Sequence, residues 1–211
     1  MIPTPSVCGV ILAAGESSRM GRDKALLPWP PGSTVETGTR RGTFLSAAIQ
    51  ALDAETELVI VVGGKNTSNL QPVVDACGGF LISNPAPERG QFSSLQVGLQ
   101  EVLSRGRDAA MITLVDRPPA RIETLRQLRA AFGEALQRGH WAVVPQFGDK
   151  HGHPYVIGRD LMEFFLKAPP GSIARDLEHQ HQPRIEYLRV DDASVVINVD
   201  TPEEYQRLVS A

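Results

Sequence analysis

The chain is poor in cysteine, and its 211 residues contain no long apolar run. Cys8 and Cys77 are too few for a disulfide framework, and each lies in or beside an apolar stretch, so we expect both to be small core residues. No apolar run approaches the roughly 18 residues that a membrane span needs. Residues 1–7 carry no basic side chain of the kind that opens a signal peptide. We therefore expect a cytoplasmic protein with no membrane partner.

A strong excess of one charge is also lacking, since the formal net charge is only -3. Binding to nucleic acid would need a local basic patch that this total conceals, and we expect small-molecule ligands instead. Hydrophobic residues make up 42% of the chain, which is enough for a substantial core. No repeat or low-complexity segment divides the chain, so we expect a single domain over residues 1–211. Residues 28–41 are expected to form a surface loop.

Short apolar runs alternate with amphipathic stretches, which predicts a sheet built from βαβ units. The strand expected at 109–115 has almost no polar residue, as in strands that are covered on both faces. The predicted fold class is therefore α/β, a three-layer sandwich with a mostly parallel, Rossmann-like sheet. The pattern predicts strands at 7–13, 58–62, 80–83, 109–115, 142–145 and 155–157, and helices at 43–52, 69–76, 93–103, 122–136, 160–166 and from 202 onward.

A glycine-rich loop at residues 12–24 is the strongest functional signal. Its small residues let backbone N–H groups approach a phosphate, and Gly15 and Gly21 allow unusual backbone conformations. The Walker motif is excluded, because five residues rather than four separate Gly15 from Gly21. The plain alternative is a βα turn that only closes the sheet. We expect the loop to bind a nucleoside triphosphate, with Arg19 and Lys24 stabilising the charge on the transferred and leaving phosphates.

Two aspartates are candidate metal ligands. Asp116 follows the expected strand 109–115, and ligands of open α/β sheets lie beyond the carboxyl ends of the strands. Asp200 is expected to follow a second apolar strand, at 195–199, and it precedes a helix start at Thr201. The two carboxylates together suit Mg²⁺, which takes one or two protein carboxylates plus phosphate oxygens. For Asp200 the alternative is a simple capping role at the helix start.

These motifs resemble those of the MobA-like nucleotidyltransferases. The Leu-Ala-Ala-Gly form of the loop is more similar to the molybdopterin cytidylyltransferase branch than to the guanylyltransferase branch, where Leu-Ala-Gly-Gly is usual. The resemblance runs through most of the chain and implies a fold like that of the nucleotide-diphospho-sugar transferases. It also implies that Arg19 and Lys24 are the phosphate-binding cations and that Asp116 and Asp200 are paired ligands of a divalent metal.

The resemblance further implies a set of nucleotide-binding residues. Asn84, Gly90 and Ser94 lie between an expected strand and the next helix, where Ser93 and Ser94 are otherwise read as plain helix caps. The candidate nucleotide-binding residues are Leu12, Ala13, Ala14, Gly15, Ser17, Arg19, Lys24, Asn84, Gly90 and Ser94.

The acceptor side is less regular. His151 and His153 could bind zinc by spacing, but no third ligand stands nearby. They resemble the Gly-His-Pro element by which the family approaches its acceptor, and the alternative is an ordinary polar loop. Two departures leave the acceptor open: Arg117 replaces the Gln of the family's Asp-Gln-Pro, and residues 171–175 lack an Asp and a Gly. Trp29 either stacks on a base or fills the core.

The resemblance therefore implies a Mg²⁺-dependent enzyme that transfers CMP from CTP to a molybdopterin-type phosphorylated acceptor and releases pyrophosphate. Its catalytic residues would be Arg19, Lys24 and Asp116, and a molybdoenzyme or cofactor-transfer protein would be its partner. One alternative is a nucleotidyltransferase that acts on a sugar or polyol phosphate. Another is a catalytically silent nucleotide-binding or chaperone-like module, against which the retention of Lys24, Asp116 and Asp200 argues.

Overall fold

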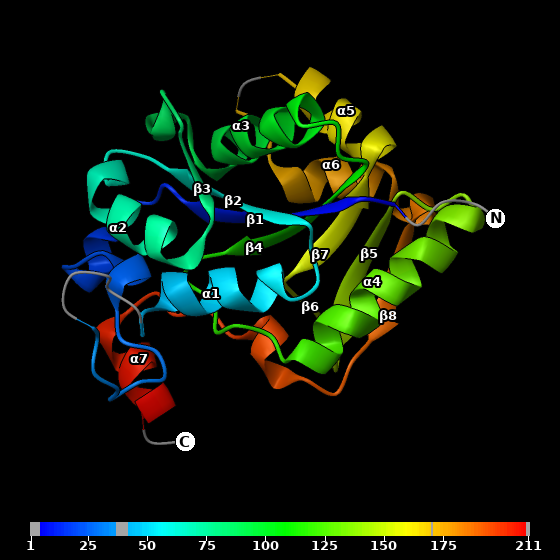
Figure 1. Ribbon diagram of the computed structural model, residues 1–211. Coiled ribbons are helices and arrows are strands. Elements are labelled where there is room, and N and C mark those ends of the chain that lie inside the picture. Colours follow the sequence, from blue (N-terminus) through cyan, green and yellow to red (C-terminus); the bar gives the residue numbers. More distant parts are fainter. Residues whose placement is uncertain (1–4, 37–41, 170, 210–211) are drawn as a thin grey trace.

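An eight-stranded sheet runs through the middle of the molecule, with helices on both faces (Figure 1). The computed structural model describes residues 5–36, 42–169 and 171–209. Strand β1 (Val7–Ala13) lies between β2 (Leu58–Gly63) and β4 (Ala109–Leu114) and is parallel to both. The strand order is β3-β2-β1-β4-β7-β5-β6, with β8 paired to β5. The remaining strands are β3 (Phe80–Ser83), β5 (Ala142–Phe147), β6 (Lys150–His151), β7 (Tyr155–Gly158) and β8 (Ile185–Arg189).

The sheet is mixed, because β7 is antiparallel to both β4 and β5. The chain leaves β1 for β2 and β3 on one side and returns to β4 on the other, so a topological switch point lies between β1 and β4. Ligands of open α/β sheets bind outside the carboxyl ends of the strands at such a point. In Figure 1 these ends of β1 and β4 point to the left.

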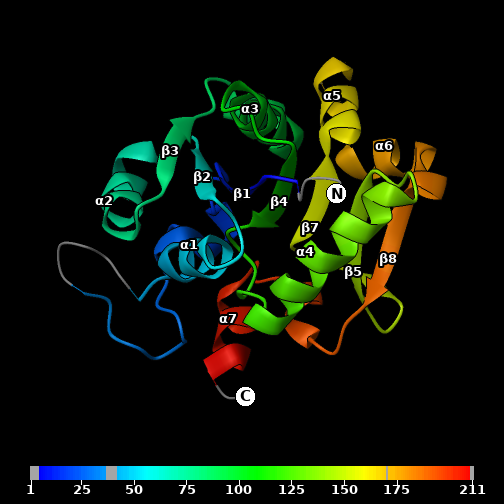
Figure 2. The ribbon, with the colours of Figure 1, turned by 45° about the vertical axis from the view of Figure 1, so that its right-hand side comes forward.

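Helices form the two outer layers, as the turned view also shows (Figure 2). The helices α3, α5 and α6 cover one face, and α1 and α4 cover the other (Figure 1). None of the helices among the described residues has the length and apolarity needed to cross a membrane. The helix bounds are α1 (Phe44–Asp53), α2 (Thr67–Cys77), α3 (Gln91–Ser104), α4 (Ile122–Gln137), α5 (Arg159–Lys167), α6 (Ala174–Gln180) and α7 (Pro202–Val209).

The side chains of β1 explain the layering. Its residues are all buried and alternate between two cores, because successive side chains of a strand point to opposite faces. Val7 and Ile11 belong to the core shared with α1 and α4, whereas Cys8 and Val10 belong to the core shared with α3 and α5. The predicted three-layer α/β architecture is confirmed, and so is the burial of Cys8.

A third, smaller core forms beside the sheet. It contains Phe44, Val199 and Tyr205, together with Met20 and Leu27 of the loop that follows β1. This core therefore joins α7 to that loop. The ring of Trp29 packs against this core, with its centroid 4.8 Å from that of Phe44. The choice that the sequence leaves open for Trp29 is therefore decided in favour of packing.

Two expectations about local structure are wrong. No strand precedes Asp200: residues Ala193–Val196 form a 3-10 helix, which is capped by the Asp192 side chain at the N–H of Ser194 (3.1 Å). Gly90, not Ser93 or Ser94, is the N-cap of α3. Strands β6 and β8 were not predicted either. Residues 37–41 of the expected surface loop lie outside the described part of the chain.

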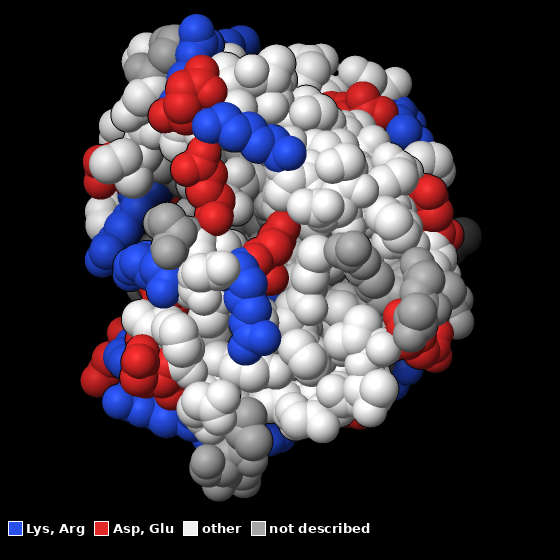
Figure 3. Space-filling view, turned by 90° about the vertical axis from the view of Figure 1, so that its left-hand side faces the viewer, with Lys and Arg blue, Asp and Glu red and all other residues white. Residues whose placement is uncertain are grey.

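On the face that α2 occupies, basic and acidic side chains are interspersed (Figure 3). The described residues of this face show no extended patch of one sign. This arrangement accords with the small formal net charge of -3.

Candidate active site

The loop after β1 is held in shape by its own side chains and by residues that are distant in sequence, above all Asn66. Ser17 adopts a left-handed backbone conformation (φ 50°), and its hydroxyl accepts a hydrogen bond from the backbone N–H of Lys24 (3.1 Å). The amide of Asn66 donates to the carbonyl of Ala13 (3.0 Å) and to the carboxylate of Asp23 (2.8 Å). Asn66 precedes α2, far along the chain, so sequence reasoning about the loop missed it.

Gly15 and Gly21 serve this loop in different ways. Gly21 has a positive φ of 69°, as predicted. Gly15 does not, and the prediction of an unusual conformation there is wrong. A Cβ atom at Gly15 would meet no atom within 4 Å, so its backbone borders open space that a ligand can approach closely. Ser17, not Gly15, carries the left-handed conformation of the loop.

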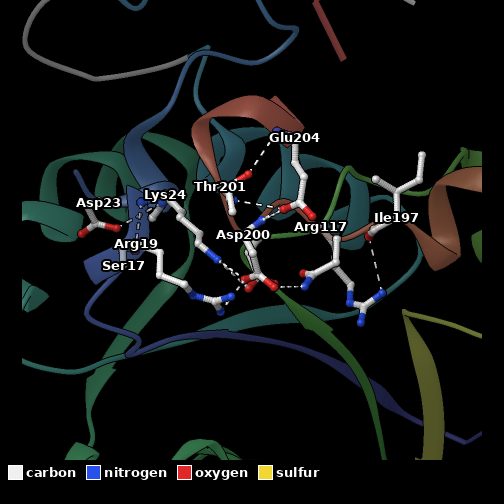
Figure 4. A network of polar contacts seen from close by, with 12 residues as sticks. Ser17, Arg19, Asp23, Lys24, Arg117, Ile197, Asp200, Thr201 and Glu204 are labelled. Carbon is white, nitrogen blue, oxygen red and sulfur yellow. Dashed lines mark hydrogen bonds and ion pairs between the residues drawn. The ribbon is translucent and has the colours of Figure 1, made fainter. Parts of the chain in front are cut away.

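Four charged side chains meet where the loop faces the ends of the strands (Figure 4). Nζ of Lys24 lies 2.6 Å from Oδ1 of Asp200 and 3.3 Å from Oδ2 of Asp116. Arg19 approaches the same Oδ1 of Asp200 at 3.3 Å, but its side chain is 69% exposed, whereas that of Lys24 is 11% exposed. The hydrogen bond from Lys24, followed by the charges of Lys24 and Arg19, lowers the pKa of the Asp200 carboxyl. The structure thus brings together the predicted cations and both predicted aspartates.

Backbone contacts, not a strand, place Asp200 beside Asp116. The N–H of Val199 donates to the carbonyl of Asp116 (2.9 Å). The carboxylate of Glu204 accepts from the N–H groups of Asp200 (2.6 Å) and Thr201 (3.0 Å), while the Thr201 hydroxyl accepts from the N–H of Glu204 (3.2 Å). This reciprocal capping box fixes the start of α7 and the backbone of Asp200 together.

The two aspartates suit a hard divalent cation. Oδ1 of Asp116 is buried and has no hydrogen-bond partner among the described residues. Carboxylate oxygens are the preferred protein ligands of Mg²⁺, which completes its shell with phosphate oxygens and water. No group of three or more His, Cys, Asp or Glu side chains that could hold a metal occurs in the part of the chain that the structure describes. The donor set therefore fits Mg²⁺ better than a metal that needs a full protein cage.

A cavity of about 680 Å³, which we call the first cavity, opens in front of these charges. Most of the predicted nucleotide-binding residues line it. Ala13 and Asn84 do not, although both belong to that set. The lining residues that carry the argument are Leu12, Ala14, Gly15, Ser17, Arg19, Lys24, Gly90, Ser94, Asp116, Arg117, Asn198 and Asp200.

Asn84 lies behind the wall of this cavity and is only 3% exposed. Its amide nitrogen donates to the hydroxyls of Ser93 (2.8 Å) and Ser94 (2.9 Å), and its Oδ1 accepts from the N–H of Ala86 (2.9 Å). These contacts fasten the start of α3 to the end of β3. Asn84 thereby orients Ser94, which does line the cavity.

A second cavity of about 840 Å³ adjoins the first and contains both predicted acceptor-binding histidines. The His151 ring is stacked on that of Tyr187, with centroids 4.1 Å apart and an angle of 14°. The Nδ1 atom of His153 is buried and has no hydrogen-bond partner among the described residues. Residues 171–175, where the chain departs from the family pattern, lie in the same wall. Tyr187, Glu178 and His179 also line this cavity and were not predicted as site residues.

The pKa values of His153 and Glu178, which both line the second cavity, are strongly displaced. Burial, reinforced by the charge of Arg117, lowers the pKa of His153 to about 3, so its imidazole is neutral at physiological pH. Burial raises the pKa of Glu178 to about 7, against the opposing effect of Arg175. The cavity therefore holds an uncharged imidazole and a carboxyl group that is partly protonated near neutral pH.

The cavity lies at the switch point of a mixed sheet and is lined by a glycine-containing loop, two cations and two carboxylates. Together with the strand order, these features define a nucleotidyltransferase of the nucleotide-diphospho-sugar transferase fold. The model of the MobA-like NTP transferase domain matches residues 9–185. The chain belongs to this family and is a nucleotidyltransferase.

Curated relatives carry names of this class, and solved structures share the fold. The chain is 30% identical to a "probable molybdenum cofactor guanylyltransferase" of Rhodopirellula baltica, over 95% of this chain and 90% of that protein. It is 22% identical to the molybdenum cofactor cytidylyltransferase of Escherichia coli, over 93% and 92%. The crystal structure of Rv0371c from Mycobacterium tuberculosis covers 100% of both chains with a TM-score of 0.80 and 25% identity. A manganese complex of that protein gives a TM-score of 0.75 at 23% identity, over 98% and 99%.

Proposed function

We propose that this enzyme transfers CMP from CTP to the phosphate of a molybdopterin-type acceptor, with Mg²⁺ as its metal and release of pyrophosphate. The observation that carries the proposal is the convergence of Asp116 and Asp200 on Lys24 at the mouth of the first cavity. The adjoining second cavity supplies room for an acceptor. A molybdoenzyme, or a protein that delivers the cofactor to one, would receive the product.

The side chains divide the work by position. Lys24, nearly buried beneath the loop, neutralises phosphate oxygens from a fixed place, whereas the exposed Arg19 reaches the departing pyrophosphate. Asp116 and Asp200 would hold Mg²⁺, and its charge would reduce the repulsion between the triphosphate and an incoming anion. The acceptor phosphate is already ionised, so the proposal assigns no residue as a general base.

The choice of base is supported by the Leu-Ala-Ala-Gly form of the loop, in which Ala14 occupies the position where the guanylyltransferase branch has Gly. A Cβ atom at Gly64 would lie 3.2 Å from the Cβ of Ala14, so the end of β2 packs closely on this residue. The most similar relatives include both guanylyl- and cytidylyltransferases by name. A direct comparison of the four triphosphates decides between them.

The test is calorimetric binding of CTP, GTP, UTP and ATP in Mg²⁺, followed by assays of pyrophosphate release with molybdopterin. We expect CTP to bind most tightly and to support turnover. A preference for GTP overturns the cytidylyl assignment but leaves the class intact. Turnover with a sugar or polyol phosphate, but none with molybdopterin, overturns the assignment of the acceptor. If the triphosphate binds but no acceptor leads to release of pyrophosphate, the assigned reaction is wrong.

The metal assignment is tested by Asp116→Asn. This change keeps the shape of the side chain but removes the charge that a divalent cation requires, so kcat should fall roughly 10²-fold or more. Titration with Mn²⁺, followed by electron paramagnetic resonance, should show weaker binding of the ion. Asp53→Asn, at the exposed end of α1, is the matched control and should leave both unchanged. Full turnover by Asp116→Asn contradicts the assignment.

A further inference from the structure

The two cavities share a wall, and one cation stands in it. Five residues line both: Leu12, Gly90, Gln91, Leu114 and Arg117. Four of these residues are uncharged. Among the described residues that line both cavities, Arg117 is therefore the one with a charge. It occupies the place where the family's cytidylyltransferase branch has Gln.

The guanidinium of Arg117 is held, but not saturated, by the protein. Its Nη1 donates to the carbonyls of Val195 (3.5 Å) and Ile197 (3.4 Å), and both contacts are long. Its Nε is buried and has no hydrogen-bond partner among the described residues. Figure 4 shows the Arg117 side chain beside Asp200 and Ile197. A buried donor without a partner is uncommon in a folded protein, and beside a cavity it indicates a place for a ligand oxygen.

The electrostatic surroundings favour an anion on the side of the second cavity. Asp116 precedes Arg117 in the chain, and Asp200 lies near it in the fold (Figure 4). Those two carboxylates already contact Lys24. The partnerless imidazole of His153 lines the second cavity together with Arg117 and is uncharged. A phosphate oxygen arriving from the second cavity would therefore meet the guanidinium of Arg117 in a lining that also holds a neutral imidazole.

Under the proposed function, an oxygen of the acceptor phosphate attacks the α-phosphorus of the triphosphate. One P–O bond forms, and the bond between the α-phosphorus and the bridging oxygen breaks, with its electron pair leaving on pyrophosphate. The two reacting anions must meet where the cavities join. A guanidinium can bind two oxygens of a phosphate at once, which both neutralises and orients it.

We propose that Arg117 binds the attacking phosphate of the acceptor at the junction of the two cavities and so selects phosphorylated acceptors. This inference rests on the proposed function. It assigns the departure from the family's Gln a positive role: the cation replaces a neutral amide at the point where two phosphates approach one another.

The test compares Arg117→Gln and Arg117→Lys with the wild-type enzyme in steady-state assays. We expect Arg117→Gln to raise the KM for the acceptor at least tenfold and to change the KM for the triphosphate less than twofold. Arg117→Lys keeps the charge but loses the planar fork, so it should recover part of the loss. Arg121→Gln is the matched control, because Arg121 is exposed and lines neither cavity.

A purely structural role would give a different result. Because Arg117 also contacts the carbonyls before Asp200, a variant that only disturbs this segment would lower Tm and raise both KM values together. That outcome overturns the inference, and so does an unchanged KM for the acceptor.

A binding probe separates this inference from the proposed function. With Mg²⁺ and a non-hydrolysable analogue of the preferred triphosphate bound, inorganic phosphate is titrated and followed by ³¹P NMR. We expect phosphate to bind the wild-type complex and to bind the Arg117→Gln complex at least tenfold more weakly. Equal phosphate affinity in both, with the analogue bound, overturns the inference alone. Failure of the analogue to bind the wild-type enzyme overturns the proposed function itself.

Discussion

Lys24 sets the electrostatics of the site at the scale of single residues. Its ammonium lies within 3.3 Å of the carboxylates of both Asp116 and Asp200, so it neutralises two like charges that would otherwise face one another. Because its side chain is 11% exposed, water replaces this interaction poorly. The lysine that is proposed to bind phosphate therefore also holds the unliganded site together.

The variant Lys24→Met tests both roles. It keeps the length of the side chain but removes the charge, which should reduce kcat roughly 10²–10³-fold. The free energy of unfolding should fall by about 1–3 kcal/mol, because two partly buried carboxylates lose their partner. Mg²⁺ should then raise Tm more in the variant than in the wild type, since the ion replaces the missing cation. Thermal melts with and without Mg²⁺ measure this difference.

Lys167→Met is the control for that experiment, because Lys167 lies exposed in the last turn of α5. Its Tm should respond to Mg²⁺ as the wild type does. If Lys24→Met shows the same Mg²⁺ response as Lys167→Met, the two carboxylates do not form the metal site that is proposed here.

At the scale of elements, a close contact beside Gly152 positions the segment that leads to Asp200. A Cβ atom at Gly152 would lie 2.7 Å from the carbonyl carbon of Val195, so only glycine fits between β6 and the 3-10 helix. The same Val195 carbonyl accepts from the N–H of His153 (2.8 Å) and from Arg117 (3.5 Å). The contact therefore couples the second cavity to the charged centre.

Gly152→Ala should destabilise the protein by roughly 1–3 kcal/mol, because the new methyl group forces backbone apart. It should also lower kcat/KM, since the displaced segment carries Asp200. Gly133→Ala in α4 is the matched control: a Cβ there meets nothing within 4 Å, and alanine in a helix interior should stabilise by about 0.5–1 kcal/mol. Urea unfolding of both variants measures the two effects. A stable and fully active Gly152→Ala variant would contradict the coupling.

The elements also show which parts of the fold the sequence could predict. Strand β1 was predicted to the residue, because a buried parallel strand reads as a continuous apolar run between polar boundaries. The apolar run before Asp200 looks the same but has no strand beside it to pair with, and the side chain of Asp192 starts a 3-10 helix instead. Strand β8 pairs with β5 over a long sequence separation, and its half-polar sequence Ile185–Arg189 carries no clear period.

At the scale of the whole molecule, the switch point between β1 and β4 decides where the chemistry lies. The carboxyl ends of neighbouring parallel strands lie at the same edge of a sheet. The sequence therefore predicts that Asp116, at the end of β4, lies beside the loop at the end of β1. The second cavity could not be predicted, because its walls come from several separate stretches of the chain. Glu178 is the clearest example: it lies on a helix rich in polar residues, but tertiary packing removes much of it from solvent.

Burial in this cavity gives the stability of the fold a particular dependence on pH. The pKa of Glu178 is raised from 4.5 to about 7, so between these values the unfolded chain has released a proton that the folded chain retains. Stability therefore falls as pH rises from 4.5 to 7. The pKa of His153 is lowered from 6.5 to about 3, so the unfolded chain binds the extra proton, and stability rises as pH increases from 3 to 6.5. The two groups oppose each other between pH 4.5 and 6.5.

The variant Glu178→Gln should separate the two contributions. Its Tm relative to wild type should increase as pH rises from 4.5 to 7 and then stay constant, because only the wild type has to ionise a buried carboxyl. Arg175, Tyr155 and Tyr187 surround the group electrostatically, and all three are unchanged in the variant. Glu134→Gln, which removes an exposed carboxylate of α4, is the control. A Tm difference that is the same at pH 5 and pH 8 would mean that Glu178 is solvated and that the second cavity is wetter than its lining indicates.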